Sequence, residues 1–110
     1  MPDLSVIIPT YNNRETLRRT LDAVAGQDLA PERYEVVVLD DGSTDGTEEM
    51  VAAYTAPVEL FYHWQPNAGR AAARNAGSRL ARGRILFYLD SDIIARPDLL
   101  SRHLQYYEGR

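Results

Sequence analysis

Four apolar runs of strand length recur along this chain, and polar residues and then a helix-type pattern follow each of them. The runs lie at residues 4–8, 34–39, 58–63 and 85–89. The last has five consecutive apolar or aromatic residues, which is typical of an inner strand in a parallel sheet covered on both faces. Strands and helices that alternate with short connections predict an α/β fold: a three-layer α/β/α arrangement with a mostly parallel sheet and right-handed crossovers.

The composition narrows the range of functions. With 110 residues the chain has the size of a single domain, and without cysteine it can form neither disulfides nor thiolate metal sites. All twelve basic residues are arginine, which excludes a lysine Schiff base and a P-loop lysine. The net charge of −4 argues against binding a nucleic-acid backbone, so we expect no nucleic-acid partner. No apolar run is long enough for a transmembrane helix.

The polar loops of the chain follow the carboxyl ends of the predicted strands. They lie at residues 10–13, 40–47, 65–70 and 90–92. Parallel strands present their carboxyl ends at one edge of the sheet, and open α/β sheets bind ligands at that edge. We therefore expect the four loops to line one crevice.

Two carboxylates, Asp90 and Asp92, come directly after the most apolar strand. Carboxylate oxygens are hard ligands suited to Mg²⁺ or Mn²⁺, which usually also binds phosphate oxygens of a substrate. The pair alone also fits a structural role, in which Asp90 caps the following turn and Asp92 is solvated. The convergence of the other loops favours the metal site.

The first strand is followed by residues suited to a nucleoside rather than by a glycine-rich phosphate loop. The chain has no G-x-G-x-x-G after that strand and no P-loop motif anywhere. The ring of Tyr11 can stack on a base, and the carboxylate of Asp41 can accept a hydrogen bond from a base N–H.

Four motifs occur in a distinctive order and spacing. They are SVIIPTYN at 5–12, VLDDGSTDGT at 38–47, NAG at 67–69 with ARNAG at 73–77, and DSD at 90–92. Over residues 4–108 this pattern resembles the amino-terminal half of a family 2 glycosyltransferase of GT-A fold. The resemblance implies transfer of a sugar from a nucleotide-diphosphate sugar, most often a UDP-sugar, to an acceptor hydroxyl, with inversion and with Mg²⁺ or Mn²⁺.

The resemblance also implies roles for individual residues. It implies that Pro9, Thr10 and Tyr11 lie around the nucleoside and that Asp41 accepts a hydrogen bond from the base. Asp40 would shape the turn.

Other positions are implied to hold the rest of the donor. Asp90 would face the ribose or donor sugar, and Asp92 would bind the metal that bridges the diphosphate. Gly69 and Arg70 would lie beside the donor, with Arg70 or Arg74 available for phosphate; Arg74 fits an exposed helix face equally well.

The same family places its catalytic base after the D-x-D motif. We therefore expect no catalytic residue within 1–110, a base beyond Arg110, and a single domain that is the donor-binding part of a GT-A enzyme without its acceptor half. Such a truncated piece would be weak or inactive, and its last helix would lack packing partners, which predicts an exposed apolar patch and self-association. The acceptor, a glycan, lipid or protein, is left open. Nucleotide sugars imply a location in the cytoplasm or on the cytoplasmic face of a membrane.

Three other hypotheses about the function stay open. A nucleotidyltransferase that makes nucleotide sugars should carry a glycine-rich, basic loop after its first strand, where this chain has PTYN. A phosphatase of the haloacid dehalogenase type has its D-x-D after the first strand rather than the fourth. A catalytically incomplete nucleotide-sugar or UDP-binding module, which needs a missing half or a partner, would carry the same motifs.

Overall fold

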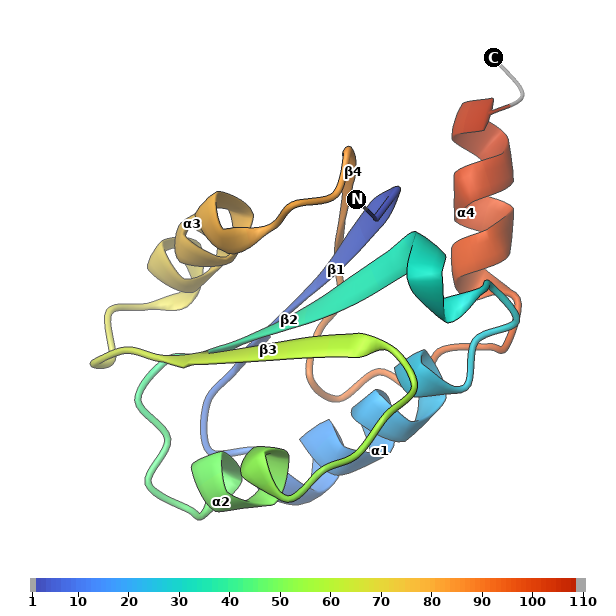
Figure 1. The fold of residues 1–110 in the computed structure, drawn as a ribbon. Coiled ribbons are helices and arrows are strands. Elements are labelled where there is room, and N and C mark those ends of the chain that lie inside the picture. The colour runs from blue at the N-terminus through green and yellow to red at the C-terminus, as the bar shows by residue number, and fades with distance from the viewer. Residues whose placement is uncertain (1, 109–110) are drawn as a thin grey trace.

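The computed structural model describes residues 2–108, and its centre is a four-stranded sheet (Figure 1). The strands are β1 (Leu4–Thr10), β2 (Tyr34–Asp40), β3 (Glu59–Trp64) and β4 (Ile85–Tyr88). They pair in the order β3-β2-β1-β4, and each pair is parallel. The expected inner position of the fourth strand is therefore wrong: β4 lies at an edge of the described sheet, and its Leu86 and Tyr88 are exposed. The predicted α/β class with a mostly parallel sheet is confirmed.

Helices cover both faces of the sheet, as Figure 1 shows. They are α1 (Arg14–Ala25), α2 (Thr47–Ala52), α3 (Arg70–Leu80) and α4 (Leu99–Glu108), with a short 3₁₀ turn at Pro31–Arg33. One face of the sheet packs against α1, α2 and α4 in the main core. The other face packs against α3, where Leu39 of β2 meets Ala73 and Ala76. The three predicted layers are therefore present.

Strand β1 runs two residues further than the sequence predicts. We expected Pro9 to begin a loop, yet Pro9 and Thr10 stand opposite Leu39 and Asp40 of β2. Strand β4 pairs with β1 only as far as Ile7, whose carbonyl accepts from Leu89 N–H. Because alternate residues of a parallel strand bond to opposite neighbours, the nitrogen of Pro9 faces the side that β4 has already left. The missing N–H of Pro9 therefore removes no hydrogen bond between β1 and its neighbouring strands.

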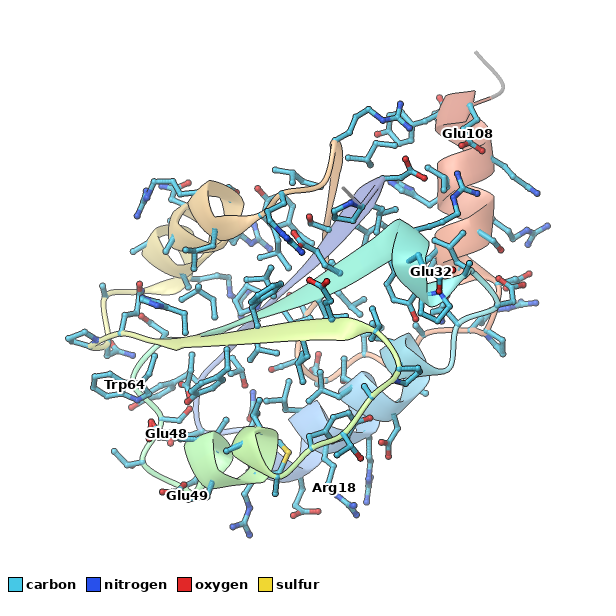
Figure 2. All side chains as sticks on the ribbon, in the orientation of Figure 1. Arg18, Glu32, Glu48, Glu49, Trp64 and Glu108 are labelled. Atoms are coloured by element: carbon cyan, nitrogen blue, oxygen red, sulfur yellow. The ribbon has the colours of Figure 1, made fainter. Side chains whose placement is uncertain are left out.

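Helix α4 has packing partners within this chain, contrary to the expectation. Leu100 and Leu104 are buried in the main core. Near the end of the helix, Glu108 (Figure 2) pairs with Arg33 at 2.6 Å. Tyr107 is about half exposed at 46%. Self-association through this helix stays a prediction.

No helix within residues 2–108 combines the length and the apolar character needed to cross a membrane.

Candidate functional site

A cleft of about 370 Å³ opens where β1, β2 and β4 end. This is the edge at which open α/β sheets bind ligands, and the volume is that of a small-molecule site. Eight of the nine residues implied by the sequence line it: Pro9, Thr10, Tyr11, Asp41, Gly69, Arg70, Asp90 and Asp92. The ninth, Arg74, does not.

Thr10 ends β1 at the floor of the cleft. Its side chain is only 4% exposed, and its Oγ1 has no hydrogen-bond partner among the described residues. A buried hydroxyl without a partner costs free energy, so such groups are rare unless they serve a ligand. Tyr11, the next residue, is 49% exposed and leaves its ring free to cover a ligand in the cleft.

Asp41 is buried under the loop that follows β3. Its Oδ1 accepts hydrogen bonds from Gln65 Nε2 and Ala68 N, both at 2.9 Å. Its Oδ2 accepts from Gly69 N at 2.9 Å and more weakly from Asn67 Nδ2 at 3.3 Å. Burial raises the pKa of this carboxyl, but the hydrogen bonds outweigh burial and hold the pKa below its ordinary value. Asp41 is therefore an ionised acceptor, and its role toward a base stays a prediction.

Asp40 does not line the cleft and is fully buried. Its Oδ1 accepts from Ser43 N at 2.9 Å, and its Oδ2 accepts from the hydroxyl of Tyr62. The first of these bonds closes the turn that follows β2. This is the turn-shaping role that the sequence analysis gave to Asp40.

The loops after β1 and β2 are tied together by reciprocal hydrogen bonds. Asn12 N–H donates to Ser43 Oγ at 2.8 Å, and Thr44 N–H donates back to Asn12 Oδ1 at 2.8 Å. Asp45 Oδ2 accepts from Arg14 N–H at 3.1 Å, which satisfies one of the free N–H groups at the start of α1. The polar residues of the D-D-G-S-T-D motif thus fix the segment that carries Thr10 and Tyr11. Sequence reasoning missed this role because the partners are about thirty positions apart.

The D-S-D turn is held to α1 through its central residue. Ser91 is 6% exposed; its carbonyl accepts from Thr20 Oγ1 at 3.1 Å, and its Oγ accepts from Asn13 Nδ2 at 3.2 Å. The flanking Asp90 and Asp92 are exposed and line the cleft. Anchoring Ser91 therefore fixes the turn that carries both carboxylates.

The described residues offer only part of a metal coordination sphere. No group of three or more histidine, cysteine, aspartate or glutamate side chains able to hold an ion occurs within residues 2–108. Asp90 and Asp92 would supply the carboxylate oxygens, since the Asp41 carboxylate in the same cleft already accepts four hydrogen bonds. Mg²⁺ is commonly held by one or two carboxylates, with water and substrate phosphates completing the octahedron. The pair fits an ion that binds together with a diphosphate.

The two arginines predicted for phosphate lie in different places. Arg70 is the first residue of α3 and lines the cleft, next to Gly69 with its positive φ of 100°. Arg74 lies one turn later, with its guanidinium carbon 5.8 Å from the centre of the Tyr88 ring. Only Arg70 is brought to the cleft.

Four lining residues were absent from the residues singled out in the sequence: Asn13, Asn67, Ala73 and Ser91. Three of them, Asn67, Ala73 and Ser91, lie inside the four motifs, and these motifs are the sequence signal that could have identified them. Trp64 (Figure 2) ends β3 nearby but does not line the cleft; its Nε1–H donates to the carbonyl of Ser43 at 3.2 Å.

Comparisons with known proteins agree with this geometry. The model of the family described as "Glycosyl transferase family 2" matches residues 5–110. A validoxylamine A glucosyltransferase of Streptomyces hygroscopicus subsp. limoneus is 44% identical over 111 residues, which cover 99% of this chain and 24% of the relative. The chain spans about a quarter of the length of the first curated relatives it matches.

Solved structures with the same fold include nucleotide complexes. S. aureus TarS 1-349 in complex with UDP-GlcNAc superimposes with a TM-score of 0.91 and 32% identity, covering 99% of this chain and 32% of that one. The mannosyltransferase PcManGT from Pyrobaculum calidifontis, in complex with GDP-Man and Mn²⁺, gives a TM-score of 0.89 and 34% identity, covering 96% and 32% of the two chains.

Proposed function

The chain belongs to glycosyl transferase family 2, and from this we propose that it binds a nucleotide-diphosphate sugar, namely a UDP-sugar, as the donor for transfer to an acceptor hydroxyl. The transfer inverts the anomeric carbon and is assisted by Mg²⁺ or Mn²⁺. Residues 1–110 form the donor-binding part of the GT-A domain.

One observation carries the proposal: eight residues from four separate segments of the chain meet in a single cleft, and the buried Thr10 hydroxyl in that cleft has no hydrogen-bond partner among the described residues. In this proposal Pro9, Thr10 and Tyr11 surround the nucleoside. Thr10 Oγ1 gains its missing hydrogen bond from the ligand, and the Tyr11 ring stacks on the base. Asp41, which is ionised and able only to accept, takes a hydrogen bond from a base N–H.

The diphosphate lies between the arginine and the carboxylates of the cleft. Arg70 binds phosphate oxygens directly. Asp90 and Asp92 hold the divalent ion, and Asp90 also faces the ribose or donor sugar. The ion, when bound, neutralises charge on the departing diphosphate. Without it, the two carboxylates would repel that group.

The choice of UDP is supported by TarS, whose structures are described as complexes with UDP and UDP-GlcNAc. PcManGT is described in complex with GDP-Man, so the identity of the nucleobase is the part of the proposal that most needs the test below. We place the catalytic base and the acceptor site outside residues 1–110, and the protein in the cytoplasm or on the cytoplasmic face of a membrane, where nucleotide sugars occur.

Calorimetric titration with UDP, with and without Mn²⁺, tests the proposal. We expect the wild-type chain to bind UDP more tightly with Mn²⁺, and Asp92→Ala to lose the metal-dependent part of that affinity. Asp28→Ala, which removes an exposed carboxylate outside the cleft, is the matched control and should bind as the wild type does. Absence of UDP binding by the folded wild-type chain would refute the donor site.

Donor hydrolysis or transfer, measured on the same chain, distinguishes an active enzyme from a binding module. Turnover that Asp92→Ala abolishes would favour the enzyme. Metal-dependent binding without turnover would favour a module that acts with further residues or a partner chain.

A further inference from the structure

We propose that Gln65 is a positioning residue for nucleobase recognition: from outside the cleft it holds the Asp41 carboxylate in the orientation and ionisation state in which it accepts a base N–H. This inference rests on the proposed donor site and adds a residue that does not touch the donor. Gln65 would thereby set the preference of the site for uracil over cytosine.

Gln65 contacts Asp41 but does not line the cleft. Asp41 lines the cleft, whereas Gln65 lines a separate surface hollow together with Ala72 and Arg79. From there its Nε2 donates to Asp41 Oδ1 at 2.9 Å. Gln65 therefore reaches Asp41 without entering the space for a nucleotide.

The hydrogen bonds divide the carboxylate into a fixed and an exchangeable oxygen. Oδ1 is held at 2.9 Å by Gln65 and by Ala68 N. Oδ2 is held at 2.9 Å by Gly69 N but only at 3.3 Å by Asn67 Nδ2, which has a better acceptor in the Asp41 carbonyl at 3.0 Å. A base N–H can replace the weak contact at Oδ2 while Gln65 keeps Oδ1 in place.

The side chain of Gln65 can be changed without removing the local backbone bonds. Gln65 N–H donates to the Asp40 carbonyl at 2.9 Å, which continues the pairing of β2 and β3. The backbone bonds from Ala68 and Gly69 to Asp41 also stay. A substitution at Gln65 therefore tests the side-chain contact rather than the loop.

The charged groups near Asp41 are few. Arg70, Asp90 and Asp92 line the same cleft, and Asp40 precedes Asp41 in the chain. Among the described residues, none of these side chains hydrogen-bonds to the Asp41 carboxylate, which takes its bonds from neutral donors of the loop after β3. Gln65 is the side-chain donor at 2.9 Å, and its loss favours the neutral carboxyl.

The protonation state of Asp41 determines which base it suits. An ionised carboxylate only accepts, and it matches the N3–H of uracil. A neutral carboxyl also donates, so it can pair with the unprotonated N3 and the amino group of cytosine. Weakening the hold on the ionised state should therefore shift the preference from UDP toward CDP.

The test compares Gln65→Met, Gln65→Glu and the control Arg79→Gln. Methionine removes the donor without adding charge, whereas glutamate places a second carboxylate against Asp41, so that the two share a proton. Arg79 lines the same hollow, and within residues 2–108 it is not among the hydrogen-bond donors to the Asp41 carboxylate. Affinities for UDP and CDP are measured by calorimetry at pH 6 and pH 8, and thermal unfolding confirms that each variant is folded.

We expect the wild type and Arg79→Gln to prefer UDP at both pH values. Gln65→Glu should lose about tenfold in UDP affinity at pH 6, shift the UDP-to-CDP preference by at least about tenfold, and recover part of both at pH 8. Gln65→Met should shift the preference in the same direction by about threefold.

Unchanged affinities in the two Gln65 variants would overturn the inference and leave the donor site standing. Equal losses for UDP and CDP at both pH values would also overturn it, because they indicate a general disturbance of the loop. If the folded wild type binds neither nucleotide, the proposed function fails and the inference fails with it.

Discussion

Thr10 and Thr20 are two buried threonines of this chain with opposite hydrogen-bonding status. Thr20 Oγ1 donates to the carbonyl of Ser91 at 3.1 Å, whereas Thr10 Oγ1 has no partner among the described residues. Both side chains are almost fully buried. The comparison separates a hydroxyl that is bonded within the fold from one that, under the proposed function, would bond to the ligand.

Thr10→Val removes an unpaired buried hydroxyl with little change of shape, so the free energy of unfolding should stay the same or rise by about 1 kcal/mol. UDP affinity should fall about tenfold, because the ligand loses a partner. Chemical denaturation and calorimetry measure the two effects.

Thr20→Val is the matched control. It removes a satisfied hydrogen bond and should lower the free energy of unfolding by about 1 kcal/mol. Equal destabilisation by Thr10→Val would mean that the Thr10 hydroxyl is already satisfied, by water for example, and would remove the observation on which its role in the cleft depends.

Helix α3 lies close against strand β1 at Gly77. A Cβ on this residue would lie 2.5 Å from Cγ2 of the fully buried Ile7. Ala73, Ala76 and Gly77 give the helix the small face that lets it lie against the sheet. This contact sets the position of the helix whose first turn carries Arg70 into the cleft.

We expect Gly77→Ala to lower the free energy of unfolding by about 1–3 kcal/mol, since the added methyl overpacks the helix–strand contact. UDP affinity should fall as well, because a shift of α3 moves Arg70. Denaturation of Gly77→Ala, Ile7→Ala and the double variant gives a double-mutant cycle. The double variant should lose less than the sum of the single losses, because Ile7→Ala removes the clashing methyl. Additive losses would show that the two residues do not compete for the same space.

Two groups, Glu35 and His103, make the stability of the molecule depend on pH in the same direction between pH 7.5 and 4. Burial raises the pKa of Glu35, but hydrogen bonds from Ser5 and Arg82 outweigh it and hold the pKa below the ordinary value of 4.5. Burial lowers the pKa of His103 below its ordinary 6.5. In both cases the unfolded chain binds more protons than the folded chain at pH values below the ordinary pKa.

Stability should therefore fall as the pH is lowered. The contribution of His103 is complete above pH 6.5 and is lost as the pH falls below that value, and the contribution of Glu35 is complete above 4.5 and is lost below it. Urea denaturation at pH 7.5, 5.5 and 4 measures the trend. Glu35→Gln should lower the free energy of unfolding at pH 7.5 by about 1–2 kcal/mol and reduce the further loss at pH 4. A stability that does not change from pH 7.5 to 4 would contradict this account.

The placement of Pro9 in β1 shows that sequence patterns do not predict how far neighbouring strands extend. The apolar runs predict strands, but they do not say that β1 extends past β4, and that difference in length is what admits a proline into an inner strand. The sequence pattern also does not show what α4 packs against. In the structure its Leu100 and Leu104 are buried in the main core of this chain.

The α/β class, the parallel sheet and the set of loops around the site can be predicted from the amino-acid sequence. Apolar periodicity selects strand or helix locally, and the carboxyl ends of parallel strands must meet at one edge. The contacts of the site residues, in contrast, are known only from the folded structure. It bonds Asp41 to the loop after β3, ties Asp45 to the start of α1, and separates Arg70 from Arg74. These outcomes depend on distances between side chains from different loops, and the order of residues along a chain does not contain those distances.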